Sequence, residues 1–225
     1  MPNGAENIVE LDARRQAVHV LEAGDAPLSS WGNEDLMIAY GAGRQEAFAE
    51  LLRRHQKGIL NFVFRMVQNR HIAEELTQEV FMALVKNRSR YTPTAKFTTY
   101  LYTIASNIVS KEWASQRRRP KLFNRPPFWN RDKDGDLPDP IERMSDATIN
   151  IVRDSERGEI SEAINLALMN LPEHQRQAFV LHRFQDLPYQ EVADIMAVPV
   201  GTVKSRVVRA ERGLRPYLER FREYL

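Results

Sequence analysis

The sequence predicts an all-α protein with two small helical domains joined by a proline-rich linker. Three observations predict this fold class. Apolar residues recur every three or four positions in successive segments, which is the period of an amphipathic helix. No segment of any length shows the alternating pattern of a strand. Between the helical halves, closely spaced prolines forbid a long helix: Pro120, Pro126, Pro127, Pro138 and Pro140.

Composition narrows the class of protein. The chain has 225 residues, enough for one large or two small domains. It has no cysteine, which excludes disulfides and thiolate metal sites and fits a reducing compartment. No apolar run approaches a membrane span, and the N-terminus lacks the order of a signal peptide. We therefore expect a soluble cytoplasmic protein without membrane insertion.

Basic residues gather in two places although the net charge is only +2. The segment from Lys111 to Arg125 holds many lysines and arginines against Glu112 alone. The segment from Val200 to Pro216 is equally basic against Glu211 alone. Two separated basic patches indicate two contacts with a polyanion.

The first domain is expected over residues 33–119. Residues 1–32 precede it as a poorly ordered extension, because glycines, prolines and a Ser-Ser pair surround one weakly helical stretch. The first helix is expected to begin near Asn33, a plausible cap. Further helices are expected over residues 45–68, 71–86 and 94–116, whose apolar stripes include Leu51, Ile59, Leu76, Val80, Leu101 and Ile108.

A linker is expected over residues 120–152, with aromatic side chains available to dock: Phe123, Phe128 and Trp129. The run Asp132–Asp136 is similar to a calcium loop. Its glycine comes too early and Arg143 stands where a closing glutamate belongs, so we exclude calcium and expect a solvated acidic turn.

The second domain is expected over residues 153–225. One helix should run from about residue 153 to 171 and the next from Pro172 to about 185, followed by a turn over residues 186–188. The segments 189–196 and 199–214 then have the lengths of a helix-turn-helix. In the last helix, helical spacing buries Val203, Val207, Ala210 and Leu214. The remaining basic and hydroxyl side chains suit phosphates and guanine edges, although a solvated basic helix is the alternative.

The motifs of both halves resemble a bacterial sigma factor of the sigma-70 family, in the extracytoplasmic-function (ECF) group. The fourth sigma region is similar to the segments 171–180, 189–195 and 200–206, and the second region to the segments 73–81 and 97–107. The likeness extends over residues 34–119 and 156–218. Response regulators share a helix-turn-helix like the second half, so it is both halves in this order that make the resemblance specific.

This resemblance implies a transcription initiation factor. Such proteins bind core RNA polymerase, recognise the −35 and −10 elements of promoter DNA and help to open the duplex. The group also leads us to expect an anti-sigma partner. It implies neither a small-molecule substrate nor a cofactor.

The resemblance assigns a polymerase-binding surface to Glu74, Glu75, Gln78, Glu79, Phe81 and Met82. Acidic groups beside apolar ones suit a basic partner. The alternative is that Glu74 and Glu75 lie in the first turn of a helix and favour its dipole.

It assigns the −10 element to residues that can stack on unpaired bases or hold phosphates: Tyr91, Thr98, Tyr100, Asn107, Lys111, Arg117 and Arg118. Aromatic rings beside small polar groups suit single-stranded DNA. Phe97 and Leu101 are expected in the core instead. Tyr100 stands where the family often has tryptophan.

It assigns the −35 element to outward residues of the last helix: Thr202, Lys204, Ser205, Arg206, Val208, Arg209 and Arg212. Of these, Arg206 and Arg212 suit backbone or solvent more than bases. Many relatives have a glycine where this chain has Asp186-Leu187. Because aspartate tolerates left-handed geometry, we expect a normal turn.

The sequence does not predict an enzyme. Its five histidines are scattered, and no phosphate loop or nucleophile motif occurs, so we expect no catalytic, metal-binding or cofactor-binding residue. Two other functions stay open. One is a helix-turn-helix DNA-binding regulator that never joins polymerase, and the other is a helical protein–protein adaptor.

Overall fold

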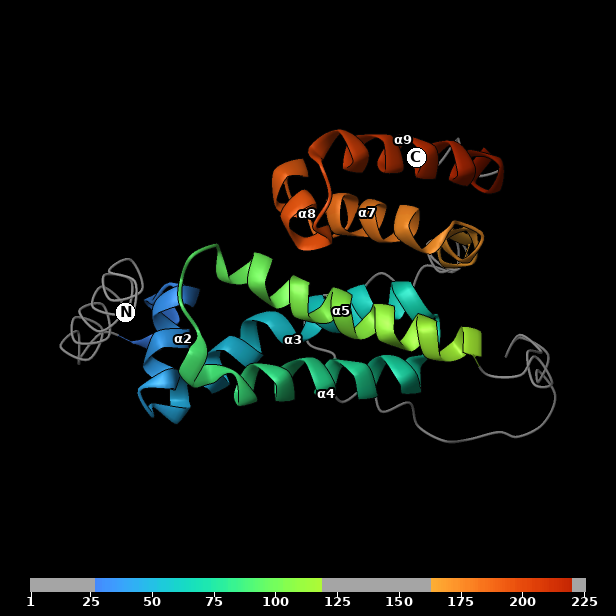
Figure 1. The fold of residues 1–225 in the computed structure, drawn as a ribbon. Helices are drawn as coiled ribbons and strands as arrows, with labels where there is room; N and C mark the ends of the chain where they lie inside the picture. Colours follow the sequence, from blue (N-terminus) through green and yellow to red (C-terminus); the bar gives the residue numbers. More distant parts are fainter. Residues whose placement is uncertain (1–26, 119–162, 220–225) are drawn as a thin grey trace, which may run out of the picture.

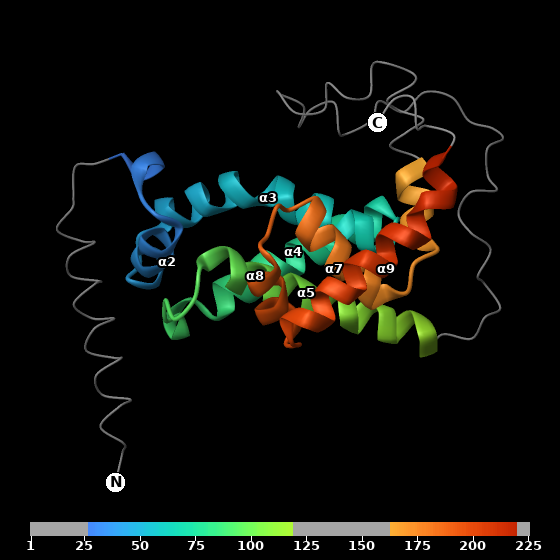
Figure 2. The ribbon, with the colours of Figure 1, turned by 90° about the horizontal axis from the view of Figure 1, so that it is seen from above.

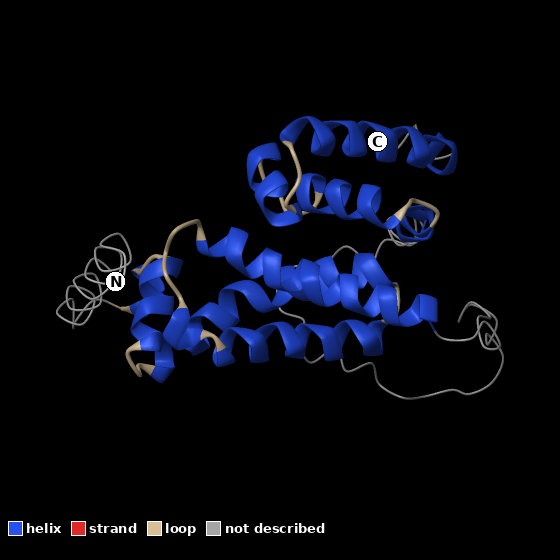
Figure 3. Cartoon of the chain, viewed as in Figure 1, coloured by secondary structure: helices blue, strands red, loops and turns tan. Residues whose placement is uncertain are grey.

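A computed structural model describes residues 27–118 and 163–219 of the chain. Within these ranges only helices, turns and loops occur, which confirms the all-α prediction (Figure 3). The linker aromatics Phe123, Phe128 and Trp129 and the acidic run Asp132–Asp136 lie outside the described residues. The helical stretch expected near residues 8–21 also lies outside them.

The first group of helices, which we call the N-terminal group, runs from α2 to α5 (Figure 1). It contains α2 (Asn33–Gly41), α3 (Gln45–Val67), α4 (Arg70–Lys86) and α5 (Phe97–Arg118), with two short 3-10 helices, η1 (Leu28–Ser30) and η2 (Arg88–Arg90). The long helix α3 packs against α2, α4 and α5. Their apolar stripes meet in a core whose fully buried side chains include Leu36, Met37, Leu51, Ile59, Phe62, Met66, Leu84, Phe97 and Leu101.

Side chains from neighbouring segments decide where two of these helices begin. At α4, the Asn69 side chain accepts a hydrogen bond from the Ile72 N–H at 3.0 Å, so the helix starts one residue before the expected His71. At α5, Glu34 Oε1 accepts a hydrogen bond from the Phe97 N–H at 2.6 Å. This contact from α2 fixes the start of α5 at Phe97 rather than at residue 94.

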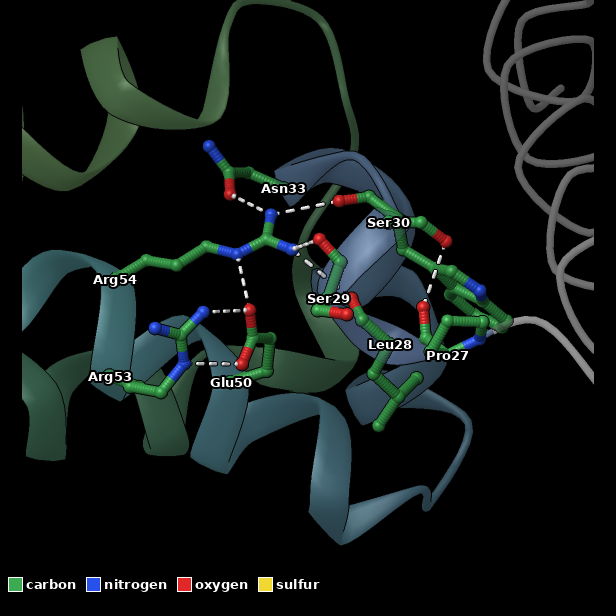
Figure 4. A network of polar contacts seen from close by, with 9 residues as sticks. Pro27, Leu28, Ser29, Ser30, Asn33, Glu50, Arg53 and Arg54 are labelled. Atoms are coloured by element: carbon green, nitrogen blue, oxygen red, sulfur yellow. Dashed lines mark hydrogen bonds and ion pairs between the residues drawn. The ribbon is translucent and has the colours of Figure 1, made fainter.

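Arg54 of α3 holds the segment before α2 (Figure 4). Its guanidinium donates to the main-chain oxygens of Leu28, Ser29 and Trp31 at 2.8–3.1 Å. It also donates to Asn33 Oδ1 at 3.0 Å and to Glu50 Oε1 at 2.7 Å. Residues 27–32 are thus ordered, a correction to the extension expected over residues 1–32. Asn33 is likewise the first helical residue rather than the cap, because Gly32 takes the cap position.

The second group, which we call the C-terminal group, contains a helix over residues 163–169, α7 (Glu173–Arg183), α8 (Tyr189–Met196) and α9 (Val200–Leu218). α9 packs against α7 and α8. Their core includes Leu168, Leu181, Val192, Val203, Val207 and Leu214. Asp186 adopts the left-handed conformation at φ 52°, as its sequence position predicts.

The two groups pack against each other (Figures 1 and 2). α8 contacts α5, and α7 contacts α3, so α5 and α3 both face the C-terminal group, and α4 lies on the other side of α5. α9 lies on the far side of α7 and α8 from α3 and α4 (Figure 1). The C-terminal group therefore has an inner side against α5 and an outer side formed by α9.

Candidate nucleic-acid interface

The helix-turn-helix is formed by α8, the turn 197–199 and α9. Ala197 ends α8 in the left-handed conformation at φ 51°, and its N–H bonds back to the oxygens of Ala193 and Asp194. Pro199 then takes the cap position of α9. The predicted apolar stripe of Val203, Val207, Ala210 and Leu214 is buried, which leaves one face of α9 outward.

The outward face of α9 carries the residues that the sequence assigned to the −35 element. Lys204, Arg209 and Arg212 are exposed, and so is Val208, whose exposed fraction is 44%. Thr202, Ser205 and Arg206 are half-buried, with Ser205 Oγ donating to the Thr202 oxygen at 2.9 Å. This face presents three long cations around one apolar side chain, a combination that suits the phosphates and base edges of a duplex.

The α8 side of the motif supports one of these cations. The Lys204 ammonium lies 5.8 Å from the centre of the Tyr189 ring. That ring stacks on His182 of α7, with the two centroids 4.0 Å apart. His182 Nδ1 is in turn 2.9 Å from the Leu187 oxygen. The rings connect α7, α8 and α9 at the base of the outward face, so Lys204 is held where the helices meet.

An aromatic cluster lies at the start of α5. Tyr91 contacts Phe97 and Tyr100, with ring centroids 6.3 Å and 5.2 Å apart. Phe97 and Leu101 are fully buried, which confirms their core assignment. Tyr91, Thr98 and Tyr100 are half-buried and form the accessible edge of the cluster. Burial raises the pKa of the hydroxyls of Tyr91 and Tyr100, so both stay neutral hydrogen-bonding groups at physiological pH.

The polar face of α5 continues from this cluster toward the end of the helix. Asn107, Lys111, Arg117 and Arg118 are all exposed. Asn107, Lys111 and Arg118 recur at spacings of four and seven residues, so they lie along one side of the helix. Arg118 donates to the Ala114 oxygen at 3.1 Å, whereas Arg117 forms an ion pair with Glu173 of α7. The assigned cations of α5 are thus partly engaged by the C-terminal group.

The surface assigned to polymerase lies on α4. Glu75, Gln78, Glu79 and Met82 are exposed, and Glu74 is half-buried. Glu74 accepts a hydrogen bond from Arg70 Nε at 2.9 Å. Because α4 begins at Arg70, its first turn contains no acidic residue, and the helix-dipole explanation for Glu74 and Glu75 loses its basis.

One residue of that assignment needs correction. Phe81 is only 6% exposed and belongs to the core, because its position on α4 faces the other helices. The apolar part of this surface is therefore Met82, with an exposed fraction of 53%.

The structure also brings together residues that sequence patterns did not single out. Arg176 of α7 is 5% exposed, and its Nη1 donates to the Met66 oxygen of α3 at 2.6 Å. Tyr102 of α5 donates to Gln185 Oε1 at 2.5 Å. These contacts join segments about 80 to 110 residues apart in the chain, and no local pattern signals them.

The described residues contain no cluster of histidines, aspartates and glutamates that could hold a metal ion. Among the helices of ranges 27–118 and 163–219, none has the length and hydropathy required to cross a membrane.

Comparison with known families identifies both groups of helices. The family model "Sigma-70 region 2" matches residues 51–119, and the model "Sigma-70, region 4" matches residues 161–214. Both regions occur in the order of a sigma factor. The chain belongs to the sigma-70 family. α3 to α5 thus carry region 2, and the C-terminal group carries region 4.

Relatives place this sigma-70 protein beside the ECF group. The RNA polymerase sigma-H factor of Pseudomonas aeruginosa is 29% identical over 83% of this chain and 95% of its own length. The ECF RNA polymerase sigma factor SigW of Bacillus subtilis is 29% identical over 78% of this chain and 91% of its own length. The ECF RNA polymerase sigma-E factor of Escherichia coli K12 is 29% identical over 76% of this chain and 86% of its own.

Solved structures share the fold. One is CnrH in complex with the cytosolic domain of CnrY, with a TM-score of 0.58 and 18% identity, covering 83% of this chain and 97% of that chain. Another is the sigma factor RpoE of Bartonella quintana in complex with the anti-sigma factor NepR, with a TM-score of 0.53 and 20% identity. The latter covers 76% of this chain and 96% of that chain.

Proposed function

We propose that this chain is a promoter-specifying subunit that binds core RNA polymerase, recognises −35 and −10 elements and promotes DNA melting. The observation that carries the proposal is the presence of both sigma regions in one chain, with an outward basic face on α9 and an aromatic and basic face on α5. In this role the chain acts in the cytoplasm, with the polymerase and the chromosome.

Double-stranded DNA at the −35 element is the proposed ligand of α9. Lys204, Ser205, Val208 and Arg209 face outward from the middle of the helix, at the depth where side chains reach base edges in a major groove. Thr202, at the start of the helix, suits a phosphate, and so do Arg206 and Arg212. In this proposal the second domain, residues 153–225, recognises the −35 element.

Melted DNA at the −10 element is the proposed ligand of α5 and the segment before it. Tyr91 and Tyr100 offer ring edges to unstacked bases, each stack being worth about 1–3 kcal/mol, and Thr98 and Tyr100 offer hydroxyls, whereas the Tyr91 hydroxyl is buried. Asn107, Lys111, Arg117 and Arg118 continue along the helix as one base-reading amide and three phosphate-binding cations. This division assigns −10 recognition to residues 33–119.

The exposed carboxylates of α4 are the proposed contact with core polymerase. Glu75 and Glu79 lie one helical turn apart beside Gln78, with Met82 one turn further on. Such a face places an apolar side chain at the end of a row of acidic and amide groups, which suits a basic partner surface. An anti-sigma factor is the proposed regulatory partner, in keeping with the NepR complex of the Bartonella quintana relative.

Association with core polymerase separates this function from the two alternatives. Purified chain and core polymerase are mixed at low salt, separated by size exclusion and tested for run-off transcription on a candidate promoter. We expect co-elution and a transcript that requires both components. Binding to DNA without polymerase would instead indicate a helix-turn-helix regulator, and association with neither would indicate an adaptor.

A matched pair of variants tests the surface itself. Glu75→Lys with Glu79→Lys reverses two exposed charges of the α4 surface and should weaken co-elution. Glu46→Lys with Glu112→Lys changes the net charge by the same amount elsewhere in the N-terminal group and should not. Equal co-elution of the two double variants would overturn the α4 assignment.

A further inference from the structure

Two ion pairs connect the C-terminal group to the end and the beginning of α5. Glu173 of α7 pairs with Arg117, and Glu191 of α8 pairs with Lys96 in the segment that leads into α5. Thr99 Oγ1 lies 3.4 Å from the other oxygen of Glu191. Carboxylates therefore pair with Arg117, one cation of the face proposed to bind the −10 strand, and with Lys96, which lies two residues before Thr98 of that face. A carboxylate paired with lysine or arginine takes the place that a DNA phosphate would take.

At the middle of the interface between the two groups of helices, a hydrogen bond joins α5 to the C-terminal group, and a glycine of α3 leaves room for it. Tyr102 of α5 donates to Gln185 Oε1 at 2.5 Å, and Tyr102 is only 7% exposed. Gly58 of α3 lies directly beneath this bond. A Cβ atom there would be 3.2 Å from the Tyr102 hydroxyl and 3.7 Å from Gln185 Oε1. The absence of a side chain at Gly58 lets the two groups approach this closely.

Two arginines anchor the other side of the interface. Arg176 of α7 donates to the Met66 oxygen in the last turn of α3, where main-chain carbonyls favour a cation. Its guanidinium also lies 5.8 Å from the centre of the Trp113 ring of α5. From the opposite direction, Arg65 of α3 lies 4.2 Å from the centre of the Phe184 ring. Each group thus inserts a cation into the other.

The composition of this interface is typical of interfaces that form and dissociate reversibly. Ion pairs and charged hydrogen bonds hold the two groups together, and such polar interfaces within a chain resemble transient ones. Arg176 Nε is buried without a hydrogen-bond partner among the described residues, so closing leaves part of that charge unsatisfied. When the interface opens, water satisfies every one of these groups.

The closed arrangement does not fit a promoter engaged at both elements. α8 contacts α5 directly. Elements centred at −35 and −10 are about 25 base pairs apart, which is roughly 85 Å along B-DNA. Residues 119–162 connect the groups, and a chain of that length reaches about 160 Å at most. The two groups must therefore separate before both elements are held.

We propose that the free chain masks part of its own −10 face, with Glu173 and Glu191 standing in for DNA phosphates, while the −35 face of α9 stays uncovered. This inference rests on the proposed function. It implies that a single-stranded nucleic acid competes with the C-terminal group for α5. Duplex DNA bound by α9 meets no such competitor.

Two double variants separate masking from a general charge effect. Glu173→Gln with Glu191→Gln removes the carboxylates that cross the interface. Glu211→Gln with Asp194→Asn removes two carboxylates of the same group that pair internally, with Arg183 and Gln190. Both double variants change the net charge by the same amount. They differ in whether the carboxylates that are removed pair across the interface between the two groups of helices.

Distances between spin labels report opening directly. The chain has no cysteine, so Ser110→Cys and Arg215→Cys introduce a single pair of labelling sites, both at exposed positions. Pulsed dipolar spectroscopy should give one short distance in the parent chain and in the Glu211/Asp194 variant. In the Glu173/Glu191 variant longer distances should appear. Identical distributions in the two double variants would overturn the proposal.

Binding of a fluorescein-labelled oligo(dT) strand of about 12 nucleotides reports unmasking. At fixed salt, the Glu173/Glu191 variant should bind this strand about three- to tenfold more tightly than the Glu211/Asp194 variant. Gly58→Ala should act in the same direction, because its methyl group enters the Tyr102–Gln185 contact. Equal affinity despite longer label distances would overturn masking of α5. Run-off transcription by the parent chain with core polymerase tests the proposed function independently of either result.

Discussion

The two groups of helices place their proposed DNA-binding faces on opposite sides of the contact between them. In the C-terminal group, α9 lies outermost, and Lys204 and Arg209 are exposed. In the N-terminal group, α5 faces inward, and two of its nearby cations pair with glutamates of the other group. The face of α9 is therefore exposed, whereas the face of α5 is partly engaged by the C-terminal group.

Whether a DNA-binding face is accessible therefore depends on how its helix packs rather than on its composition. Both faces are basic and both contain hydroxyl groups. α9 is backed by α7 and α8, and within residues 27–118 and 163–219 no other helix lies beyond it (Figure 1). α5 has helices on two sides, because α8 packs on the side opposite α4.

The N-terminal group depends on its large core. Phe62 is fully buried at its centre, so Phe62→Ala should lower the free energy of unfolding by about 3–5 kcal/mol. Trp31 and Trp113 both belong to this group, so tryptophan fluorescence in urea, in a Trp129→Phe background, reports its unfolding. At urea concentrations that unfold only this group, α9 should still bind −35 duplex DNA. Parallel loss of both signals would contradict the separation of the two groups.

The outer face should be sensitive to a single cation. Arg209→Ala should weaken binding to a −35 duplex by about 1–3 kcal/mol if Arg209 contacts a base, and should leave oligo(dT) binding unchanged. Arg215→Ala is the matched control, since Arg215 is exposed on the same helix but lies beyond the last assigned residue, Arg212, toward the C-terminal end. Fluorescence anisotropy at fixed salt measures both. An Arg209→Ala chain with unchanged duplex affinity would refute the assignment.

The cap of α4 should contribute a smaller amount to the N-terminal group alone. Asn69→Ala removes the hydrogen bond to the Ile72 N–H and should cost about 1 kcal/mol of stability. Asn61→Ala makes the same chemical change at an exposed position within α3 and should be neutral or slightly stabilising. Urea unfolding measures both. Equal destabilisation by the two variants would show that the cap does not hold α4.

Acid should act on the N-terminal group through His55, with the smallest expected effect. Burial lowers the pKa of this imidazole, which packs 5.3 Å from the Phe97 ring. As the pH falls below about 6.5, the unfolded chain binds a proton that the folded chain does not, so stability decreases. His55→Leu should remove this pH dependence from urea unfolding measured between about pH 7.5 and 5.5. His71→Leu, at an exposed site, should retain it.

Local patterns predicted most of the fold. The bounds of α8, the buried stripe of α9 and the left-handed Asp186 follow from residues within one or two turns of each other. The start of α5 did not, because Glu34, 63 residues earlier in the chain, accepts its first N–H. The ordered segment 27–32 was also missed, because Arg54 holds it from α3.

The candidate site was predictable in composition but not in accessibility. The resemblance selects Arg117 as a DNA contact, and nothing near it in the sequence indicates that Glu173 pairs with it. The burial of Phe81 was likewise not predictable from the sequence. Its aromatic side chain could have lain on the surface, and it is buried because of how α4 packs against the other helices. A surface belongs to the assembled helices, so side-chain chemistry alone does not define it.

We propose that this chain opens promoter DNA only as part of a polymerase. The most direct test places the fluorescent base 2-aminopurine in the −10 element of a promoter found by mapping transcription starts after overexpression. We expect a rise in fluorescence when chain and core polymerase are both present, and no rise with either alone. Unchanged fluorescence in the presence of both, with α9 still bound to the upstream duplex, would contradict it.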